Sequence, residues 1–171
     1  DNVNCKSNQQ HYGTIKSSNL CAEINEYSDM KEYACCTLSS ICVKEFVEVV
    51  PIGEKTDLYI LHSDDKFQYC YDFKKLEEVV EVVTTNLDKI IDINKYPVPQ
   101  TEYSNKKHRP LGIGVQGLAD TFMMSRVPYD SEKAKQLNKL IFETIYYSSV
   151  KTSNALSYKH GPYETFQGSP I

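Results

Sequence analysis

The sequence contains no apolar run close to the roughly 20 consecutive residues that a membrane-spanning helix requires, so we expect no transmembrane segment. Its beginning, Asp1–Asn4, lacks the charged and apolar regions of a secretory signal peptide, so we also expect no secretion. Basic residues are not in excess, because 19 Lys and Arg stand against 23 Asp and Glu, a formal net charge of −4. This balance disfavours a protein that binds nucleic acid through its phosphates.

The six cysteines form no C-x-x-C pair, a spacing typical of structural zinc sites. Cys35 and Cys36 are adjacent, and neighbouring side chains cannot both enter one tetrahedral site without distorting the backbone. His11, His62 and His160 have no cysteine or carboxylate at ligand spacing. We therefore predict reduced thiols, no metal site and a cytoplasmic protein.

The 171 residues, 40% hydrophobic and 25% charged, fit one globular α/β domain in which we find no internal repeat and no linker. Small, β-compatible residues predict a strand over 33–43, and the apolar run Phe46–Val50 predicts another. The runs 58–61 and 67–71, on either side of the turn-forming Ser63–Lys66, predict a hairpin.

Apolar residues three and four positions apart predict an amphipathic helix over 72–94, with Asp72 as its N-cap. A polar, basic segment over 104–109 is expected to be a solvated loop. Two further helices are predicted, over 115–125 and over 131–159.

Gly112–Gly117 matches G-x-G-x-x-G, the pattern of dinucleotide-binding loops. That function requires a buried strand before the motif, within a βαβ unit, whereas the expected loop over 104–109 precedes it. We therefore interpret the glycines as sites of close helix packing. We interpret the basic residues of the loop as a solvated surface rather than a phosphate site.

Reactive side chains are concentrated in Ser17–Glu23. If this segment is extended, Asn19, Cys21 and Glu23 share one face, about 7 Å apart in sequence order. An amide, a thiol and a carboxylate so placed could hold a polyol, move a proton and carry out redox or nucleophilic chemistry. The alternative is a buried cysteine near a surface glutamate, a common arrangement without catalysis.

Nine segments, taken in order, resemble the large (catalytic) subunit family of ribonucleotide reductases, in its class I, eukaryote- and large-virus-like branch. The segments are Lys6–Gln10, Ser18–Glu23, Cys36–Ser39, Tyr71–Leu76, Asn86–Asn94, Tyr96–Pro99, His108–Asp120, Phe142–Tyr147 and Gly161–Thr165. They cover nearly the whole chain in the order that the family has. The glycine motif falls inside one of them.

The resemblance implies that residues 1–171 are a single partial domain, an internal part of a ten-stranded α/β barrel with Cys21 on a finger loop. It implies reduction of ribonucleoside diphosphates to deoxyribonucleoside diphosphates by thiyl-radical chemistry, for DNA precursor synthesis. The stretch between Cys36 and Tyr71 is longer than the family leads us to expect. We therefore expect 46–70 to be a surface hairpin insertion away from the active site.

Residue roles also follow from the resemblance. Cys21 would become the thiyl radical that removes the 3′ hydrogen of the ribose, and Glu23 would accept the 3′-hydroxyl proton. Asn19 would hydrogen-bond the substrate hydroxyls. Cys36 would be one member of a redox-active disulfide whose partner lies outside this chain. The implied substrate-binding residues are Ser18, Asn19, Leu20, Cys21 and Glu23.

The resemblance implies further components of a complete enzyme. These are a radical-generating, metal-containing small subunit, a large-subunit homodimer, ATP and deoxynucleotide effectors, and a thioredoxin- or glutaredoxin-type reductant. No cofactor, metal, nucleic acid or membrane is expected to bind this chain itself. Two alternatives remain: a split-gene product that is active only with its other half, and a diverged module without catalysis. The intact Asn19, Cys21, Glu23 and Cys36 disfavour the second.

We expect the chain expressed alone to be inactive and only marginally folded. Strands separated from their barrel neighbours leave open edges, and helices lose the sheet that they should cover. The apolar faces expected to become exposed are Val79, Val83 and Leu87 in one helix and Leu137, Ile141 and Ile145 in another.

Overall fold

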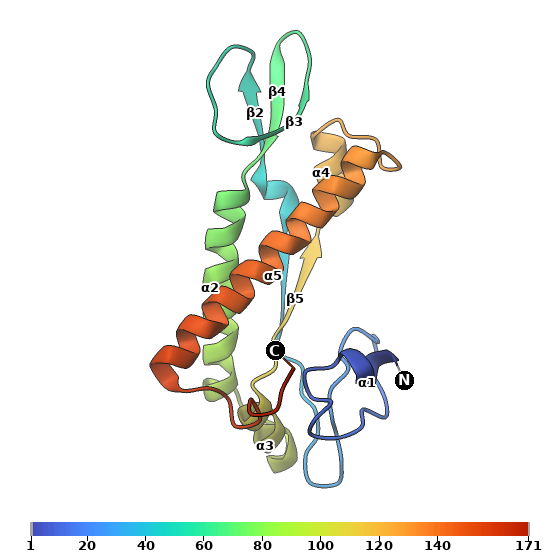
Figure 1. The fold of residues 1–171 in the computed structure, drawn as a ribbon, viewed down its shortest axis with the longest axis vertical. Coiled ribbons are helices and arrows are strands. Elements are labelled where there is room, and N and C mark those ends of the chain that lie inside the picture. Colours follow the sequence, from blue (N-terminus) through green and yellow to red (C-terminus); the bar gives the residue numbers. More distant parts are fainter. Residues whose placement is uncertain (1, 171) are drawn as a thin grey trace. The chain divides into compact units, whose positions relative to one another are not determined.

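The computed structural model describes residues 2–170, which form a mixed α/β structure (Figure 1). Its elements are α1 (Asn2–Lys6), β1 (Leu38–Cys42), the 3-10 helix η1 (Val43–Phe46), β2 (Val47–Pro51), β3 (Tyr59–Ser63), β4 (Phe67–Tyr71), α2 (Phe73–Ile93), α3 (Pro99–His108), β5 (Gly112–Gln116), α4 (Leu118–Met124) and α5 (Glu132–His160).

The described chain divides into two compact units. Unit 1 contains the residues up to Leu38, the segment Thr85–Gly112 and the residues from Asn154 onward. Unit 2 contains Ser39–Thr84 and Ile113–Ser153. Helices α2 and α5 each contribute residues to both units.

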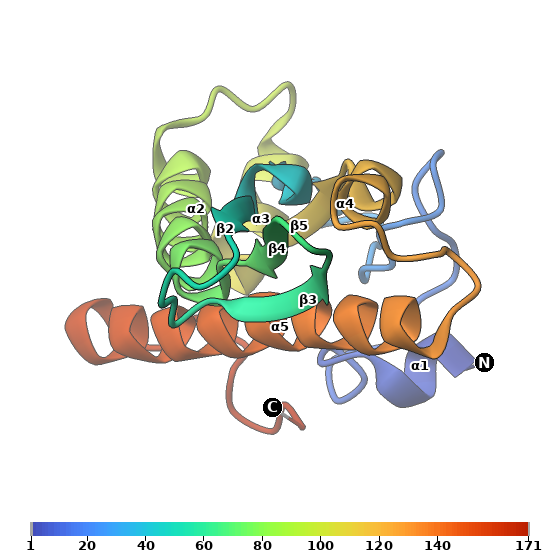
Figure 2. The same ribbon diagram turned by 90° about the horizontal axis from the view of Figure 1, so that it is seen from above.

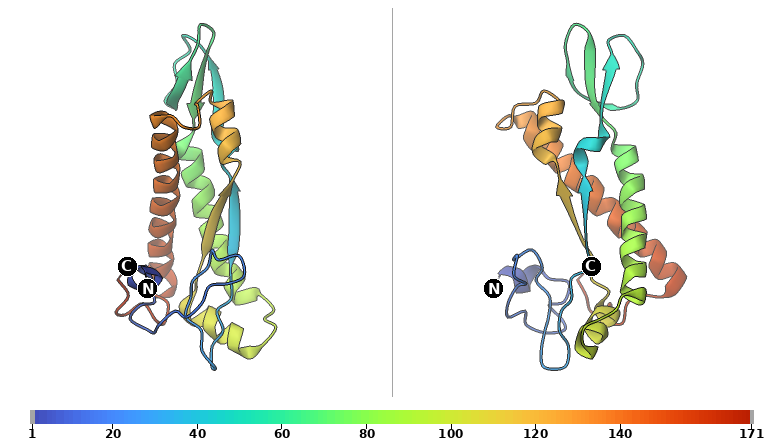
Figure 3. Two further views of the ribbon diagram at one scale, coloured as in Figure 1. Left: turned by 90° about the vertical axis from the view of Figure 1, so that its right-hand side faces the viewer. Right: turned by 180° about the vertical axis from the view of Figure 1, so that it is seen from behind.

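Strands β2, β4 and β3 of unit 2 form an antiparallel sheet, in that order, which we call the β-arm. Figure 3 shows that the β-arm continues past the beginning of α2. In the β3–β4 turn, Asp64 Oδ1 accepts hydrogen bonds from the backbone N–H groups of Lys66 (2.9 Å) and Phe67 (2.8 Å). The predicted hairpin is therefore confirmed, and the strand predicted at Phe46–Val50 joins it. That 46–70 is an insertion remains a prediction.

The hydrophobic core of unit 2 combines residues from the β-arm, α2, α4 and α5. Its buried members are Ile41, Val43, Phe46, Leu61, Tyr71, Leu76, Val80, Phe122, Val127, Ala134, Leu137, Ile141 and Ile145. Tyr71 is fully buried, and its hydroxyl donates to the carbonyl oxygen of Val43 over 3.0 Å. Lys151 of α5 forms ion pairs with Glu77 and Glu81 of α2. Figure 2 shows these two long helices.

The expected exposure of the helix stripes is wrong. Leu137, Ile141 and Ile145 are buried within the chain itself, and Val79 and Val83 pack against the same core. The sequence pattern identified the apolar faces of these helices. In the structure η1, the β-arm and α4 cover these faces, whereas a larger sheet was expected to do so.

The two long helices are confirmed with small changes of their ends. Asp72 caps α2, because its Oδ1 accepts a hydrogen bond of 2.9 Å from the Lys75 N–H. Helix α5 ends at His160, and Gly161 follows with a φ of +86°, which a residue with a Cβ adopts only with strain.

Two local predictions are wrong. The strand predicted over 33–43 is limited to β1, Leu38–Cys42, and the expected solvated loop over 104–109 is mostly the end of α3. Pro99 begins α3, a position that favours proline because its missing N–H would be unpaired there. The buried residues of α3 are polar, so the helix carries no apolar stripe in its sequence.

Two of the three motif glycines, Gly112 and Gly114, lie in strand β5 and not at a helix packing site, whereas Gly117 directly precedes α4. A Cβ on Gly112 would lie 2.3 Å from Leu38 Cδ2, so the glycine permits a close approach to β1. The helix predicted over 115–125 is the shorter α4, which Gly117 precedes with a φ of +75°.

The described residues thus confirm the α/β class. Strands β1 and β5 form a two-stranded sheet and the β-arm a three-stranded one, and neither closes into a barrel. Within residues 2–170, no helix combines the length and the apolar character needed to cross a membrane.

The packing of α5 yields a stability prediction. Ile141→Ala should lower the free energy of unfolding by about 2–5 kcal/mol, because Ile141 is fully buried and the lost methyl groups leave a cavity. The neighbouring Phe142→Ala is the matched control, since Phe142 is 43% exposed. Urea unfolding of both variants measures the difference. Equal losses for the two would contradict the packing described here.

Candidate functional site

The segment Ser17–Glu23, which carries the candidate site residues, is an irregular loop that reverses direction. The backbone N–H of Ala22 donates to the Asn19 carbonyl oxygen (3.1 Å), and Ala22 has a φ of +63°. The Asn19 N–H donates to the carbonyl oxygen of Ile24 (3.1 Å), and Asn19 Oδ1 accepts from the Ile24 N–H (3.0 Å). The extended arrangement considered for this segment is therefore not formed, because an asparagine that bonds its own backbone neighbours favours a turn.

The Asn19 side chain connects two of the predicted site residues. Its Nδ2 donates to Glu23 Oε1 over 2.7 Å and lies 3.8 Å from Cys36 Sγ. Cys21 lies in the turn between Asn19 and Glu23 and is exposed. The amide, the carboxylate and the Cys36 thiol thus meet through a turn, and not on one face of a strand.

The other two residues of the implied substrate-binding set lie beside this turn. Ser18 is exposed, and the Leu20 side chain is fully exposed at the tip.

The environment of the cysteines favours neutral thiols. Partial burial, the carboxylate of Glu26, the neighbouring Cys35 and the carboxylate of Glu23 raise the pKa of Cys36, against a lowering hydrogen bond from Asn19. Burial, together with Glu26, also raises the pKa of Cys35. Near neutral pH these sulfurs therefore carry hydrogen, the form that can deliver a hydrogen atom or a proton.

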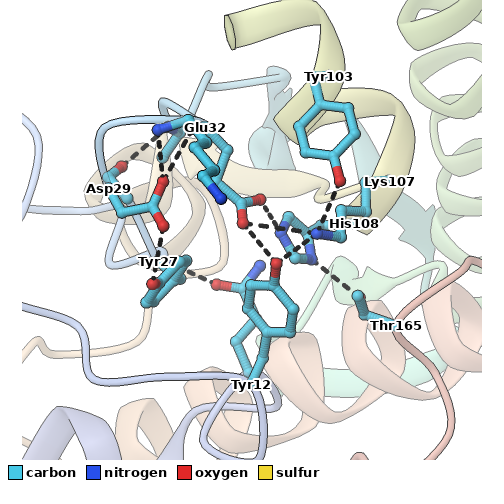
Figure 4. Close-up of polar contacts among 12 residues, drawn as sticks. Tyr12, Tyr27, Asp29, Glu32, Tyr103, Lys107, His108 and Thr165 are labelled. Atoms are coloured by element: carbon cyan, nitrogen blue, oxygen red, sulfur yellow. Dashed lines mark hydrogen bonds and ion pairs between the residues drawn. The ribbon is translucent and has the colours of Figure 1, made fainter.

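A second cluster of unit 1, which we call the Glu32 cluster, joins residues that are far apart in the sequence and was not predicted (Figure 4). Its members are Tyr12, Glu32, Lys107, His108 and Thr165. Glu32 Oε1 accepts a hydrogen bond of 2.6 Å from the Tyr12 hydroxyl, which in turn accepts one from Lys107. Glu32 Oε2 lies 2.7 Å from His108 Nε2, and His108 Nδ1 lies 2.8 Å from Thr165 Oγ1.

Within the Glu32 cluster, His108 is neutral and Lys107 carries the positive charge. Burial lowers the pKa of His108, so the neutral ring donates from Nε2 to Glu32 and accepts from Thr165 at Nδ1. Burial opposes the charge of Lys107, but hydrogen bonds to Tyr12 and Tyr103 and the Glu32 charge raise its pKa. Lys107 Nζ, 3.5 Å from Glu32 Oε1, is therefore the cation that balances the buried carboxylate.

The Glu32 cluster holds in place the chain segment that connects the Asn19–Glu23 turn to Cys36. Glu32 lies between Glu23 and Cys36 in the sequence, in a turn that Asp29 closes by accepting the Glu32 N–H over 3.0 Å. Thr37, which follows Cys36, receives a hydrogen bond from Asn105 Nδ2 at its Oγ1 (3.1 Å). The segment that ends at Cys36 is thereby held at Glu32 and at Thr37.

Asn105, Lys107 and His108, which support the site, lie in the segment 104–109 that was interpreted as a solvated loop. That interpretation is wrong. Lys107 and His108 are buried, and Arg109 forms ion pairs of 2.8 Å with Asp88 and Asp92. A guanidinium so occupied is not available as a phosphate contact. The sequence signal that could have identified α3 is Pro99 followed by polar residues at helical spacing. A buried helix face made of polar residues, however, gives no hydrophobic periodicity.

Within the described residues, 2–170, no group of three or more His, Cys, Asp and Glu side chains is arranged so that it could hold a metal ion.

Comparison with known proteins agrees with this architecture. Residues 1–171 match the family model of the ribonucleotide reductase barrel domain. The chain therefore belongs to the ribonucleotide reductase barrel-domain family, as the resemblance of its motifs implied.

Individual relatives support the same assignment. The chain is 53% identical over 173 residues to the ribonucleoside-diphosphate reductase large subunit of Arabidopsis thaliana, a match that covers 100% of this chain and 21% of the relative. It is 51% identical over 170 residues to large chain 2 of Saccharomyces cerevisiae, covering 99% of this chain and 18% of the relative. The large subunit of Variola virus is 52% identical over 169 residues, with 99% and 20% covered. The chain thus spans about a fifth of the length of these relatives.

The Glu32 cluster yields a prediction of pH dependence. His108→Asn should lower the free energy of unfolding at pH 7 by about 1–3 kcal/mol, because Glu32 and Thr165 lose a buried partner. Since the folded state lowers the pKa of His108, the unfolded chain takes up its proton first as the pH falls through about 6.5. The wild type therefore loses stability between pH 7 and pH 5 through this residue, and the variant should lose less.

Urea unfolding at pH 5, 6 and 7 measures both effects. His160→Asn is the matched control, because His160 is exposed at the end of α5. An unchanged pH dependence in the His108 variant would show that the ring is not held neutral by burial.

Proposed function

We propose that this chain forms the hydrogen-abstracting part of a ribonucleoside-diphosphate reductase large subunit, an enzyme that converts ribonucleoside diphosphates to deoxyribonucleoside diphosphates for DNA synthesis. The main support is the 51–53% identity, over nearly the whole chain, to relatives that carry this name. The contacts of Asn19 with Glu23 and Cys36 are a second, independent support.

In this proposal the exposed turn receives the ribose. Cys21, as a thiyl radical, removes the hydrogen atom from C3′, and its sulfur becomes a thiol. Glu23 accepts the proton of the 3′-hydroxyl, and the substrate radical then expels the 2′-hydroxyl, which takes a proton from one of the two reducing thiols and leaves as water. Asn19 hydrogen-bonds the hydroxyls, and its 2.7 Å contact with Glu23 keeps amide and carboxylate together for this task. Ser18 and Leu20 complete the substrate contacts.

Cys36 and a second cysteine outside this chain supply the two electrons of the reduction. Their two thiols are oxidised to one disulfide while the C2′–O bond is replaced by C2′–H and water leaves. The Cys21 thiol returns its hydrogen atom to C3′, which restores the thiyl radical. The raised pKa of Cys36 suits this role, because a thiol and not a thiolate provides the hydrogen that the substrate needs.

The same proposal includes components beyond this chain. A small subunit that contains a metal generates the radical, and a thioredoxin- or glutaredoxin-type protein reduces the disulfide. Nucleotide effectors regulate a homodimer of large subunits in the cytoplasm. Residues 1–171 form one partial domain of a ten-stranded barrel in this assembly, and 46–70, which includes most of the β-arm, is a surface insertion.

Cys21→Ser in the complete subunit tests the proposed radical site. Deoxynucleotide formation should fall to background, because a serine O–H bond is too strong for its oxygen to replace sulfur as the radical carrier. Nucleotide binding should persist, since Asn19 and Glu23 remain. Cys5→Ser, at another exposed cysteine, is the matched control and should keep full activity. Turnover by the Cys21 variant would refute the proposed function.

The adjacent cysteines allow a second test. Cys36→Ser should permit hydrogen abstraction but not complete reduction, so free base should be released in place of the deoxynucleotide. Cys35→Ser should leave turnover nearly unchanged. Chromatography of the products of both variants distinguishes them, and the reverse result would assign the redox role to Cys35.

A further inference from the structure

Asn105 is a buried asparagine of α3 to which the proposed mechanism gives no role. It is 1% exposed, and its Nδ2 donates two hydrogen bonds, one to Thr37 Oγ1 over 3.1 Å and one to the Tyr96 hydroxyl over 2.9 Å. Tyr96 donates in turn to the carbonyl oxygen of Ile91, near the end of α2, over 2.6 Å. Both N–H groups of the amide are therefore occupied, and one of them ends on the residue that follows Cys36.

Thr37 is held from two sides. Its hydroxyl accepts the hydrogen bond from Asn105, and its carbonyl oxygen accepts one from the Gly112 N–H over 2.9 Å. Thr37 is 7% exposed and directly precedes β1. Cys36, on its other side, is exposed, and its sulfur lies 3.8 Å from Asn19 Nδ2. The redox cysteine of the proposed mechanism thus occupies the last position of a loop that ends at a fixed residue.

The Asn105 side chain is not an efficient source of stability. Its amide oxygen, Oδ1, is buried and has no hydrogen-bond partner among residues 2–170. A buried acceptor without a partner costs free energy, which offsets part of what the two donated hydrogen bonds contribute. An apolar side chain at this position would avoid that cost. The asparagine is therefore better explained by where it holds Thr37 than by the stability of the fold.

We propose that Asn105 is a positioning residue for Cys36, which it places through its hydrogen bond to Thr37. This inference rests on the redox role of Cys36 in the proposed function. Movement of Thr37 also moves Cys36, because consecutive residues share a rigid peptide plane. The contact from Asn105 limits this movement and keeps the Cys36 thiol beside the Asn19 amide, where the proposed mechanism places the ribose.

The test uses the complete subunit with its small subunit and reductant and measures both products, deoxynucleotide and free base. Their sum counts the hydrogen abstractions, and their ratio shows how often Cys36 completes the reduction. Asn105→Leu should raise the ratio of free base to deoxynucleotide about threefold to tenfold, the effect of one lost hydrogen bond, and leave the sum within about twofold. Damage to the fold alone would lower the sum and leave the ratio unchanged.

Variants of Thr37 test whether Asn105 acts through this residue. Thr37→Val removes the hydroxyl and keeps the shape, so it should raise the ratio as Asn105→Leu does. Thr37→Ser retains the hydroxyl and should keep a ratio close to that of the wild type. In the double variant of Asn105→Leu with Thr37→Val, the increase should equal that of one single variant, because both changes remove the same hydrogen bond. Asn94→Leu, at an exposed asparagine after α2, is the matched control and should leave the ratio unchanged.

Three outcomes would overturn the proposal: an unchanged ratio in Asn105→Leu, a ratio in Thr37→Ser as high as in Thr37→Val, or increases that multiply in the double variant. If Asn105→Leu does not fold, the two Thr37 variants still test the same hydrogen bond. Absence of both products from the wild-type subunit would refute the proposed function and this inference with it. A wild type that turns over, with an unchanged ratio in the variants, would refute the positioning role alone.

Discussion

The buried carboxylate of Glu32 is the constraint on which the ordered part of unit 1 depends. Its side chain is 3% exposed, and a charge so far removed from water is stable only with a balancing charge and satisfied hydrogen bonds. Lys107 supplies the charge, and Tyr12 and His108 supply the hydrogen bonds. Because breaking such an arrangement costs about 3–5 kcal/mol, the chain segments that carry these residues are held together.

This constraint explains how an irregular loop can hold a site. The segment from Asn19 to Cys36 has no helix or strand, so its backbone is fixed by side chains that accept or donate to it. Asn19 and Asp29 each accept a backbone N–H, and Glu32 joins the segment to the buried cluster. Polar contacts thus replace the ladder of hydrogen bonds that a sheet would provide.

The parts of the fold that could be predicted are those with a hydrophobic period. The stripes of α2 and α5 and the turn residues between β3 and β4 identified these elements within a few residues of their ends. Helix α3 escaped prediction because its inner face is polar and carries no apolar signal, and the partners of these side chains lie on other segments, as Thr37 does for Asn105. Burial of polar groups depends on partners far apart in sequence, such as Thr165 with His108, and a local pattern does not contain them.

The members of the candidate site were proposed from the sequence, but their geometry could not be. An extended segment would place Asn19, Cys21 and Glu23 on one face, whereas the asparagine turns the backbone and brings its own amide to Glu23 and Cys36. The turn places Cys21 at an exposed tip and leaves Cys36 beside two carboxyl groups that disfavour its thiolate. A nucleophilic cysteine needs the opposite environment, with cations or helix N-termini nearby. The surroundings of Cys36 therefore favour its thiol over its thiolate.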